Sequence, residues 1–310
     1  MGLGISGLAS QVMANVTRVT NGAAASPNQA ARDVKTVAGT VFPAAVLAVD
    51  LLMARVPGSA QAGGGAGAVA PAAPSSVGGG AMGAPASGAA RRDPVILVHG
   101  FASSSASMES YAQALRRDGH DVTVVDMPAN AQGDINASSA VLAQQVEAVK
   151  RRTGSSRVDL VGHSEGGLIS RNYVENYGGA NSVDSVVTLG TPNNGLGLGA
   201  ATNQAVLGSS FMRSLIPTAL QQMLTGSGFL GNVNGSDGTL DPRVRYTSVY
   251  NGLGDGVVAA DSSRLDGARN VALPGAVTRN HAGLLTDDLA YASVREALDG
   301  SPSPTTAAST

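Results

Sequence analysis

The pentapeptide Gly162-His-Ser-Glu-Gly166 constrains the fold more than any other feature of the chain, because of what flanks it. A short apolar run, 158–161, precedes it, and a helix-compatible segment, 168–177, follows at once. This order predicts a serine on a tight strand-to-helix turn, where side chains at the two glycine positions would clash. Such a turn exposes the hydroxyl of Ser164 and aims the next N–H and the helix N-terminus at whatever the serine attacks. Because 41 of 310 residues are glycine, the strand-turn-helix context is stronger evidence than the letters alone.

The order of elements around this turn predicts the fold class. Apolar and alternating runs predict strands, and segments of helical spacing separate them. The predicted strands are 93–101, 121–126, 158–161, 185–189, 243–250 and 270–273, and the predicted helices are 108–117, 140–152, 168–177 and 284–298. Such alternation predicts a three-layer α/β fold with a mostly parallel central sheet that binds ligands at the carboxyl ends of its strands. Ser138 or Ser139 is available to cap the second helix.

Composition divides the chain into four parts. Residues 58–92 are dominated by Gly, Ala, Pro, Ser and Val and predict a flexible linker. Residues 300–310 predict a disordered tail, and 93–299 are patterned like one compact catalytic domain. Inside that domain, 191–242 is rich in Gly and Asn and breaks the alternation.

The N-terminal part, 1–57, allows two interpretations. Two basic residues precede an apolar stretch, 36–53, and Ala60-Gln-Ala62 resembles a cleavage site, as in an export signal. The alternative is a marginal amphipathic helix, and the charge of Asp50 makes a membrane-spanning helix costly. An export signal would predict a secreted or cell-envelope protein, and a cytoplasmic location is the alternative.

A serine nucleophile needs a general base, and the chain has only four histidines. His120 begins a strand beyond a helix-ending glycine, which predicts a surface position. His163 adjoins Ser164 in the turn and should point away from it, and His99 ends the first strand and is expected to be structural. His281 follows the last short strand, so we expect it to be the base, with a structural loop histidine as the alternative.

The base needs an acid that fixes its tautomer, and three aspartates lie between the serine and His281. Asp255 follows the strand that ends at Tyr250 and can turn toward the base. Asp261 is the main rival, and Asp266 more readily caps a turn. We favour Asp255 and keep the other two as alternatives.

Two main-chain N–H groups are needed to stabilise a tetrahedral oxyanion. Glu165 follows the nucleophile, and Phe101 follows the His99-Gly100 turn, so these two residues are the predicted donors. The side chain of Glu165 is expected at the surface or in the first helical turn, where it suits the helix dipole.

Helical spacing over 211–223, split at Pro217, offers an apolar face. It could bind an acyl chain, or it could be ordinary core packing.

Several segments together resemble the bacterial class 2 triacylglycerol lipases, a compact branch of the α/β-hydrolase fold. They are Pro94–Phe101, Val158–Gly167, Val186–Pro192, Tyr246–Tyr250, Ser263–Val271 and His281–Leu285, within about 60% of the chain. The resemblance implies the triad Ser164, Asp255 and His281, the oxyanion donors Phe101 and Glu165, and a small or absent lid. Asn193-Asn194 stands where many relatives carry His, which should affect packing rather than chemistry.

The leading hypothesis is therefore hydrolysis of carboxylic esters through an acyl-enzyme. Acyl transfer or thioester cleavage by the same triad is the alternative, and an inactive binding module is a third. We expect an ester or lipid substrate, transient contact with a lipid interface and no obligate protein partner. A net charge of −2 without a long basic run argues against nucleic acid, and the absence of cysteine excludes disulfides and thiolate ligands. No cofactor or metal is expected, since the aspartates show no clear calcium-ligand spacing.

Overall fold

The central feature of the computed structural model is a six-stranded sheet in which every pairing is parallel. The structure describes residues 92–197, 200–214, 216–235, 238–276 and 279–300. The strands are β1 (Val95–Val98), β2 (Val122–Val125), β3 (Val158–His163), β4 (Val183–Leu189), β5 (Arg245–Asn251) and β6 (Arg269–Leu273). Their order across the sheet is β2-β1-β3-β4-β5-β6. The predicted parallel sheet is confirmed, whereas the predictions for 1–57, for nearly all of 58–92 and for 301–310 lie outside the described residues.

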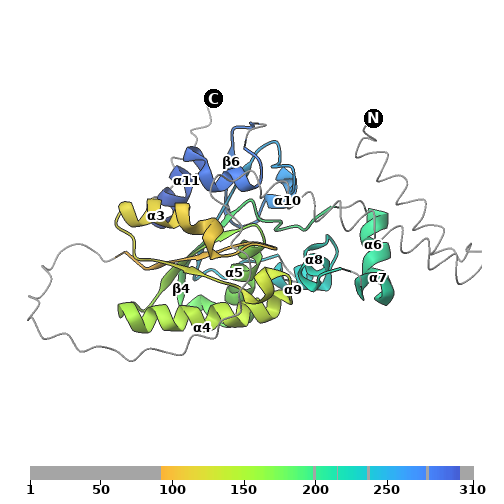
Figure 1. Cartoon of the computed structure of the whole chain (residues 1–310), viewed down its shortest axis with the longest axis horizontal. Coiled ribbons are helices and arrows are strands. Elements are labelled where there is room, and N and C mark those ends of the chain that lie inside the picture. Colours follow the sequence, from red (N-terminus) through yellow and green to blue (C-terminus); the bar gives the residue numbers. More distant parts are fainter. Residues whose placement is uncertain (1–91, 198–199, 215, 236–237, 277–278, 301–310) are drawn as a thin grey trace, which may run out of the picture.

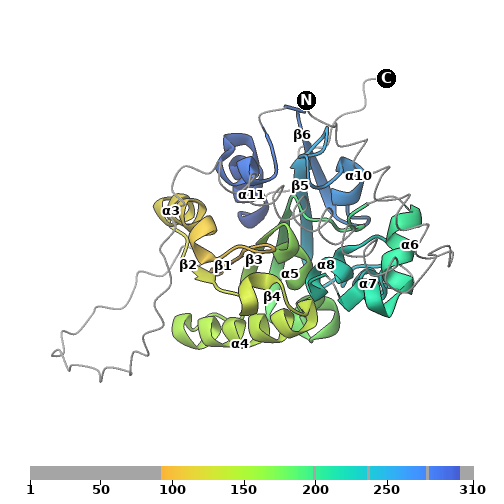
Figure 2. The ribbon, with the colours of Figure 1, turned by 45° about the vertical axis from the view of Figure 1, so that its right-hand side comes forward.

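Helices cover both faces of the sheet (Figure 1, Figure 2). They include α3 (Glu109–Arg117), α4 (Ile135–Thr153), α5 (Glu165–Asn176), α10 (Ala260–Ser263) and α11 (Asp288–Leu298). Short 3-10 turns join them at η1 (Ser105–Met108), η2 (Pro128–Ala131), η3 (Gly179–Asn181) and η4 (Ala282–Thr286). Figure 1 shows α3 and α11 on one side of the sheet and α4 on the other. The three predicted layers are therefore present.

The strand β1 shows how the two cores form. All four of its residues are fully buried. Ile96 and Val98 join the cluster under α4 and α5, and Val95 and Leu97 join the cluster under α3 and α11. Because alternate side chains point to opposite faces, a continuous apolar run is what a strand between two helical layers requires.

The helix α4 begins five residues earlier than predicted. The Asp134 carboxylate accepts a hydrogen bond from the Asn136 N–H, 2.9 Å away, and is the N-cap. The prediction that Ser138 or Ser139 caps this helix is wrong, since both are buried inside it. Ser139 donates its hydroxyl to the Ile135 carbonyl at 2.8 Å, so its polar group is satisfied within the helix.

The described residues of the insertion between β4 and β5 form four short helices. They are α6 (Ala200–Gly208), α7 (Ser210–Ser214), α8 (Thr218–Met223) and α9 (Gly228–Val233). Pro217 precedes α8, which confirms the predicted split. Met223 is buried and Leu220 packs against the same core cluster, so at these two positions the apolar spacing serves core packing. Figure 2 shows α6 and α7 on the right-hand side of the molecule.

The closing segment is two elements rather than one helix. The turn η4 ends at Thr286, and Asp287 then caps α11 by accepting hydrogen bonds from the N–H groups of Leu289 and Ala290. The predicted single helix over 284–298 is therefore wrong in its first turn. Within the described ranges, no helix has both the length and the apolar character needed to cross a membrane.

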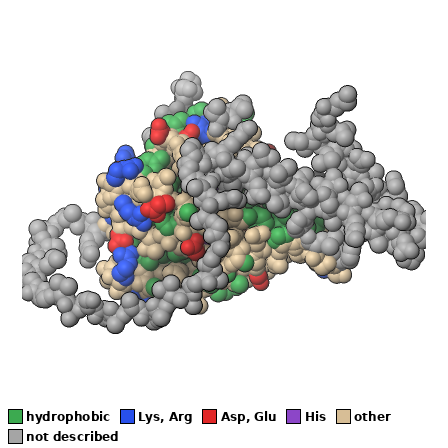
Figure 3. Space-filling view, in the orientation of Figure 1, with side chains coloured by type: hydrophobic (Ala, Val, Ile, Leu, Met, Phe, Trp, Pro, Cys, Tyr) green, Lys and Arg blue, Asp and Glu red, His purple; other side chains and the backbone are tan. Residues whose placement is uncertain are grey.

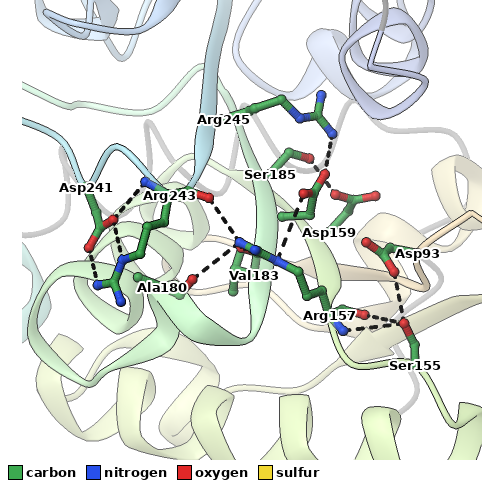
Figure 4. A network of polar contacts seen from close by, with 11 residues as sticks. Asp93, Ser155, Arg157, Asp159, Ala180, Val183, Ser185, Asp241, Arg243 and Arg245 are labelled. Atoms are coloured by element: carbon green, nitrogen blue, oxygen red, sulfur yellow. Dashed lines mark hydrogen bonds and ion pairs between the residues drawn. The ribbon is translucent and has the colours of Figure 1, made fainter.

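A network of polar contacts joins the amino ends of the strands (Figure 4). The guanidinium of Arg157, just before β3, donates to the main-chain carbonyls of Val183, Ala180 and Arg243. These bonds tie the starts of β3 and β4 to the segment that leads into β5. Figure 3 shows basic and acidic side chains gathered near this end of the visible face.

The same network contains a buried acid, Asp159. Its carboxyl accepts the hydroxyl of Ser185 at 2.6 Å. Burial raises its pKa to about 7 despite that bond, and the neighbouring Asp184 adds to the increase. Asp159 is the second residue of β3, so it lies at the end of the sheet where the strands begin, and Figure 4 shows it beside Ser185 and Arg245.

Candidate active site

Ser164 lies between the end of β3 and the start of α5, as the sequence predicts. Its backbone has φ 55° and ψ −127°, a conformation that costs a residue with a side chain of the order of 1–3 kcal/mol. A Cβ on Gly162 would lie 2.4 Å from the main chain of Gly166, and one on Gly166 would lie 2.1 Å from the carbonyl oxygen of Val98. Glycine is therefore required on both sides of the serine.

The turn after β1 passes directly beside Ser164. A Cβ on Gly100 would lie 2.7 Å from the Cβ of Ser164 and 3.3 Å from its Oγ. Phe101 follows Gly100 immediately, and Glu165 follows Ser164 as the first residue of α5. The structure thus brings the residues predicted to supply the oxyanion N–H groups to the neighbourhood of the hydroxyl.

His99 fixes the turn that carries Phe101. Its Nε2 accepts the main-chain N–H of Met127 at 3.0 Å, so its Nδ1 carries the proton and donates to the Gly100 carbonyl at 2.9 Å. Burial lowers the pKa of His99, which favours this neutral tautomer. The Gly100 carbonyl belongs to the same peptide as the Phe101 N–H, so the imidazole orients that N–H. In this arrangement His99 orients the main chain, which is the structural role expected for it.

Asp255 and His281 form a buried pair. The Nδ1 of His281 lies 2.7 Å from Asp255 Oδ2, and the other carboxylate oxygen accepts the N–H groups of Val257 and Val258. Burial alone would raise the pKa of Asp255, but these hydrogen bonds hold it below its ordinary value. The group is therefore a carboxylate, and it accepts a hydrogen bond from the Nδ1–H of His281.

The two alternative acids lie elsewhere. Asp261 is exposed in the first turn of α10, and Asp266 is exposed in the turn before β6. Among the described residues, only Asp255 forms an ion pair with His281. The three residues Ser164, Asp255 and His281 follow β3, β5 and β6, so all lie beyond the carboxyl ends of neighbouring strands.

A glycine that the sequence analysis did not single out makes room for this pair. Gly190 follows β4 with φ 59°, and a Cβ there would lie 2.7 Å from Leu284 Cδ1 and 3.0 Å from Asp255 Oδ2. It would also lie 3.5 Å from His281 Nδ1. The only sequence signal for this role was the position of Gly190 directly after a predicted buried strand. That signal does not reveal the crowding, because the residues beside Gly190 come from segments more than 60 residues away.

The Glu165 side chain is not at the surface, which corrects one part of its prediction. It lies in the first turn of α5, but it is fully buried, and neither carboxyl oxygen has a hydrogen-bond partner among the described residues. Burial raises its pKa well above the ordinary value and thereby favours the neutral carboxyl. The expectation failed because the first ten residues of α5 are all buried, so this helix has no solvent-facing side there.

His120 also differs from its prediction. It is buried rather than at the surface, and neither ring nitrogen has a hydrogen-bond partner within the described chain. Burial, together with the charge of Arg92, lowers its pKa. The glycine before it does end a helix, but the following strand begins inside the protein.

Asn193, the first residue of the Asn193-Asn194 pair, has a packing role in the structure. Its side chain is buried, accepts a hydrogen bond from Arg171 at 3.2 Å and donates to the Ser263 carbonyl at 2.8 Å. It thereby joins α5 to the segment that follows Asp255. As for metals, no group of three or more His, Cys, Asp or Glu side chains within the described ranges is placed to hold one.

Comparison with protein families gives a match over much of the domain. The family model described as the alpha/beta hydrolase fold matches residues 93–221. A triacylglycerol lipase of Pseudarthrobacter phenanthrenivorans is 39% identical over 114 residues, which cover 34% of this chain and 35% of that protein. A triacylglycerol lipase of Burkholderia plantarii is equally similar, over 34% of this chain and 31% of its own length. The chain thus spans about a third of the length of these curated relatives.

Two solved structures share the arrangement over most of the described chain. The mature form of the Bacillus licheniformis lipase BlEst2 superimposes with a TM-score of 0.54 at 21% identity, covering 67% of this chain and 92% of that one. The lipase B of Aspergillus fumigatus gives a TM-score of 0.54 at 22% identity, over 67% of this chain and 52% of that one. At this level of identity the likeness concerns the fold.

Proposed function

Since the chain has the α/β-hydrolase fold, we propose that it is a serine hydrolase that cleaves carboxylic esters with Ser164, His281 and Asp255. The observation that supports this most directly is the buried Asp255–His281 pair, with 2.7 Å between carboxylate and imidazole. It lies at the same edge of the sheet as a serine on a strained turn. A base with a fixed tautomer and a serine hydroxyl, here half-buried, are the two parts that acyl transfer through serine requires.

The proposed reaction follows from the positions of these groups. The Oγ of Ser164 attacks the ester carbonyl while the Nε2 of His281 takes its proton. The Asp255 carboxylate accepts a hydrogen bond from Nδ1–H and stabilises the imidazolium that forms. The main-chain N–H groups of Phe101 and Glu165 face the negative charge of the tetrahedral oxygen.

The acyl-enzyme then forms and is broken down. The imidazolium of His281 gives its proton to the departing alcohol, which leaves the acyl group on Ser164. A water molecule attacks this ester while His281 takes its proton. The imidazolium then returns that proton to Ser164 Oγ as the bond to the acyl carbon breaks, which releases the carboxylic acid and restores the enzyme.

Lipid or acylglycerol esters are the proposed substrate class. The relatives named triacylglycerol lipases support it, and so does the resemblance of several motifs to the bacterial class 2 lipases. On this proposal the protein contacts a lipid interface transiently, and it acts outside the cytoplasm or at the cell envelope.

The test is hydrolysis of p-nitrophenyl esters of increasing chain length by the wild type and by Ser164→Ala. We expect the variant to lose of the order of 10³-fold or more in kcat. Ser293→Ala, on the outer helix α11, is the matched control and should behave as wild type. Equal rates from wild type and Ser164→Ala would refute the proposal.

A further inference from the structure

His163, the residue before the nucleophile, contacts the proposed base directly. Its ring is buried at the end of β3, and its Nε2 lies 3.0 Å from the main-chain carbonyl oxygen of His281. Because a carbonyl only accepts, Nε2 must carry the hydrogen. The two imidazole rings also pack together, with centroids 4.8 Å apart and planes inclined by 41°.

The ring of His163 stays uncharged. Burial, followed by the influence of His281, lowers its pKa to about 3. Its donor is therefore a neutral N–H across the ordinary working range. During turnover the positive charge develops on His281 alone, without a second cation stacked against it.

The hydrogen bond from His163 reaches His281 from a different side than Asp255 does. Asp255, after β5, accepts both the main-chain N–H of His281, at 2.9 Å, and its Nδ1 proton. His163 instead holds the carbonyl of His281, and it does so from β3. The base is thus held at both ends of its own residue, by the last residue of β3 and by the loop after β5.

This contact matters because the nucleophile is the next residue in the chain after His163. Ser164 follows it directly, so a single hydrogen bond connects the backbone of the base to the strand that carries the nucleophile. Without it, the position of His281 relative to Ser164 would depend on the longer path through Asp255, β5 and the rest of the sheet. An error of about 1 Å in such a distance can cost of the order of 10²-fold in rate.

We propose that His163 is a positioning residue that fixes the base His281 relative to Ser164 through the carbonyl of His281. The proposal rests on the proposed function of Ser164 and His281. It assigns to His163 no contact with substrate and no proton transfer, only the placement of the imidazole that performs it.

Two variants separate the effect of the hydrogen-bond donor of His163 from the effect of its ring. His163→Gln removes the ring but keeps an amide N–H near the position of Nε2, whereas His163→Phe keeps a ring and loses the donor. We expect His163→Phe to lose about 10- to 100-fold in kcat for a soluble short-chain p-nitrophenyl ester, with KM within about twofold of wild type. His163→Gln should remain within about fivefold of wild type.

His163→Phe could fold poorly, which circular dichroism and thermal unfolding would detect. A third variant keeps the test decisive in that case. His163→Asn carries the same amide as His163→Gln on a shorter side chain, so its N–H cannot reach the carbonyl of His281. The proposal predicts that Asn loses activity as Phe does and that Gln retains it. Equal activity of Gln and Asn, or a folded His163→Phe with kcat within twofold of wild type, would overturn it.

A spectroscopic measurement keeps this test independent of turnover. The Nδ1 proton shared between His281 and Asp255 should give a far-downfield proton resonance, identified by its loss in His281→Ala. We expect the resonance to persist in His163→Gln and to shift or broaden in His163→Phe and His163→Asn. If the wild type hydrolyses no ester, the proposed function fails, while an unchanged resonance in all three variants would by itself refute the role of His163.

Discussion

Asp255 holds His281 twice, through its main-chain carbonyl at 2.9 Å and through its carboxylate at 2.7 Å. The first bond fixes where the residue sits, and the second fixes how its ring is turned and which nitrogen bears the proton. A side-chain substitution at Asp255 can therefore remove the second bond and leave the first intact.

Asp255→Asn should fold normally and lose about 10²- to 10⁴-fold in kcat, because an amide can donate to Nδ1 and select the wrong tautomer. Asp261→Asn, at the exposed alternative acid, is the matched control and should keep its activity. Steady-state kinetics with a short-chain ester measure both. If Asp261→Asn lost activity instead, the assignment of the acid would be wrong.

Gly190→Ala should damage activity and stability together. The new methyl would lie 3.0 Å from Asp255 Oδ2 and 2.7 Å from Leu284 Cδ1, so the acid–base pair must shift. Gly178→Ala is the control, because it has a similar φ of 75° but nothing within 4 Å of its Cβ. The control should lose only about 1 kcal/mol of unfolding free energy and no activity. Similar kinetics for the two variants would contradict the crowding at Gly190.

His99→Phe should lower kcat about 10- to 100-fold, since the Gly100 carbonyl and the Met127 N–H both lose their partner and the Phe101 N–H is no longer oriented. Affinity for a boronic acid that mimics the tetrahedral intermediate should fall in parallel, with little change in KM. His120→Leu, at a buried histidine without a hydrogen-bond partner in the described chain, should retain activity and stability. Unaltered boronate affinity in His99→Phe would disprove the orienting role.

Glu165→Gln should be nearly neutral. Burial raises the pKa of this carboxyl and favours its neutral form, which an amide of the same shape resembles. We expect kcat/KM within about threefold of wild type from pH 6 to 9, and Glu165→Lys should fail to fold because it buries an unpaired cation. A loss of more than tenfold in Glu165→Gln would show that the acid proton takes part in the chemistry.

The buried Asp159 should make stability depend on pH. Its pKa is about 7 in the folded protein, above the ordinary value of 3.8, so the folded state binds the proton more tightly. The contribution is therefore fully present below about pH 4 and is lost as pH rises through about 7, a change of up to about 4 kcal/mol. Asp159→Asn should flatten this dependence and be the more stable protein at pH 8, as measured by urea unfolding at pH 4, 6 and 8. A wild type that gained stability between pH 5 and 8 relative to the variant would contradict it.

The residues that the sequence placed correctly are those governed by local rules. The glycines around Ser164, the apolar run of β1 and the break at Pro217 follow from backbone geometry and strand burial, and each is confirmed. Chain order admitted three aspartates, and the position directly after a predicted strand favoured Asp255, which the structure pairs with His281.

The residues whose places or roles the sequence did not predict depend on contacts between distant segments. Glu165 is buried because α5 is enclosed on all sides, which nothing in its own turn reveals. Gly190 and His163 acquire their roles only when β4 and β3 are brought beside the loops after β5 and β6. The N-cap of α4 was missed because Asp134 lies ahead of the apolar periodicity that marked the helix.

The two edges of the sheet can be engineered separately. The charged network around Arg157 and the buried Asp159 lie where the strands begin, and the residues proposed for catalysis lie where the same strands end. Substitutions that adapt the protein to heat or alkaline media can therefore be confined to the first edge, with the second left for changes in selectivity. Attachment to a solid support through the first edge would likewise leave Ser164 facing the reaction medium.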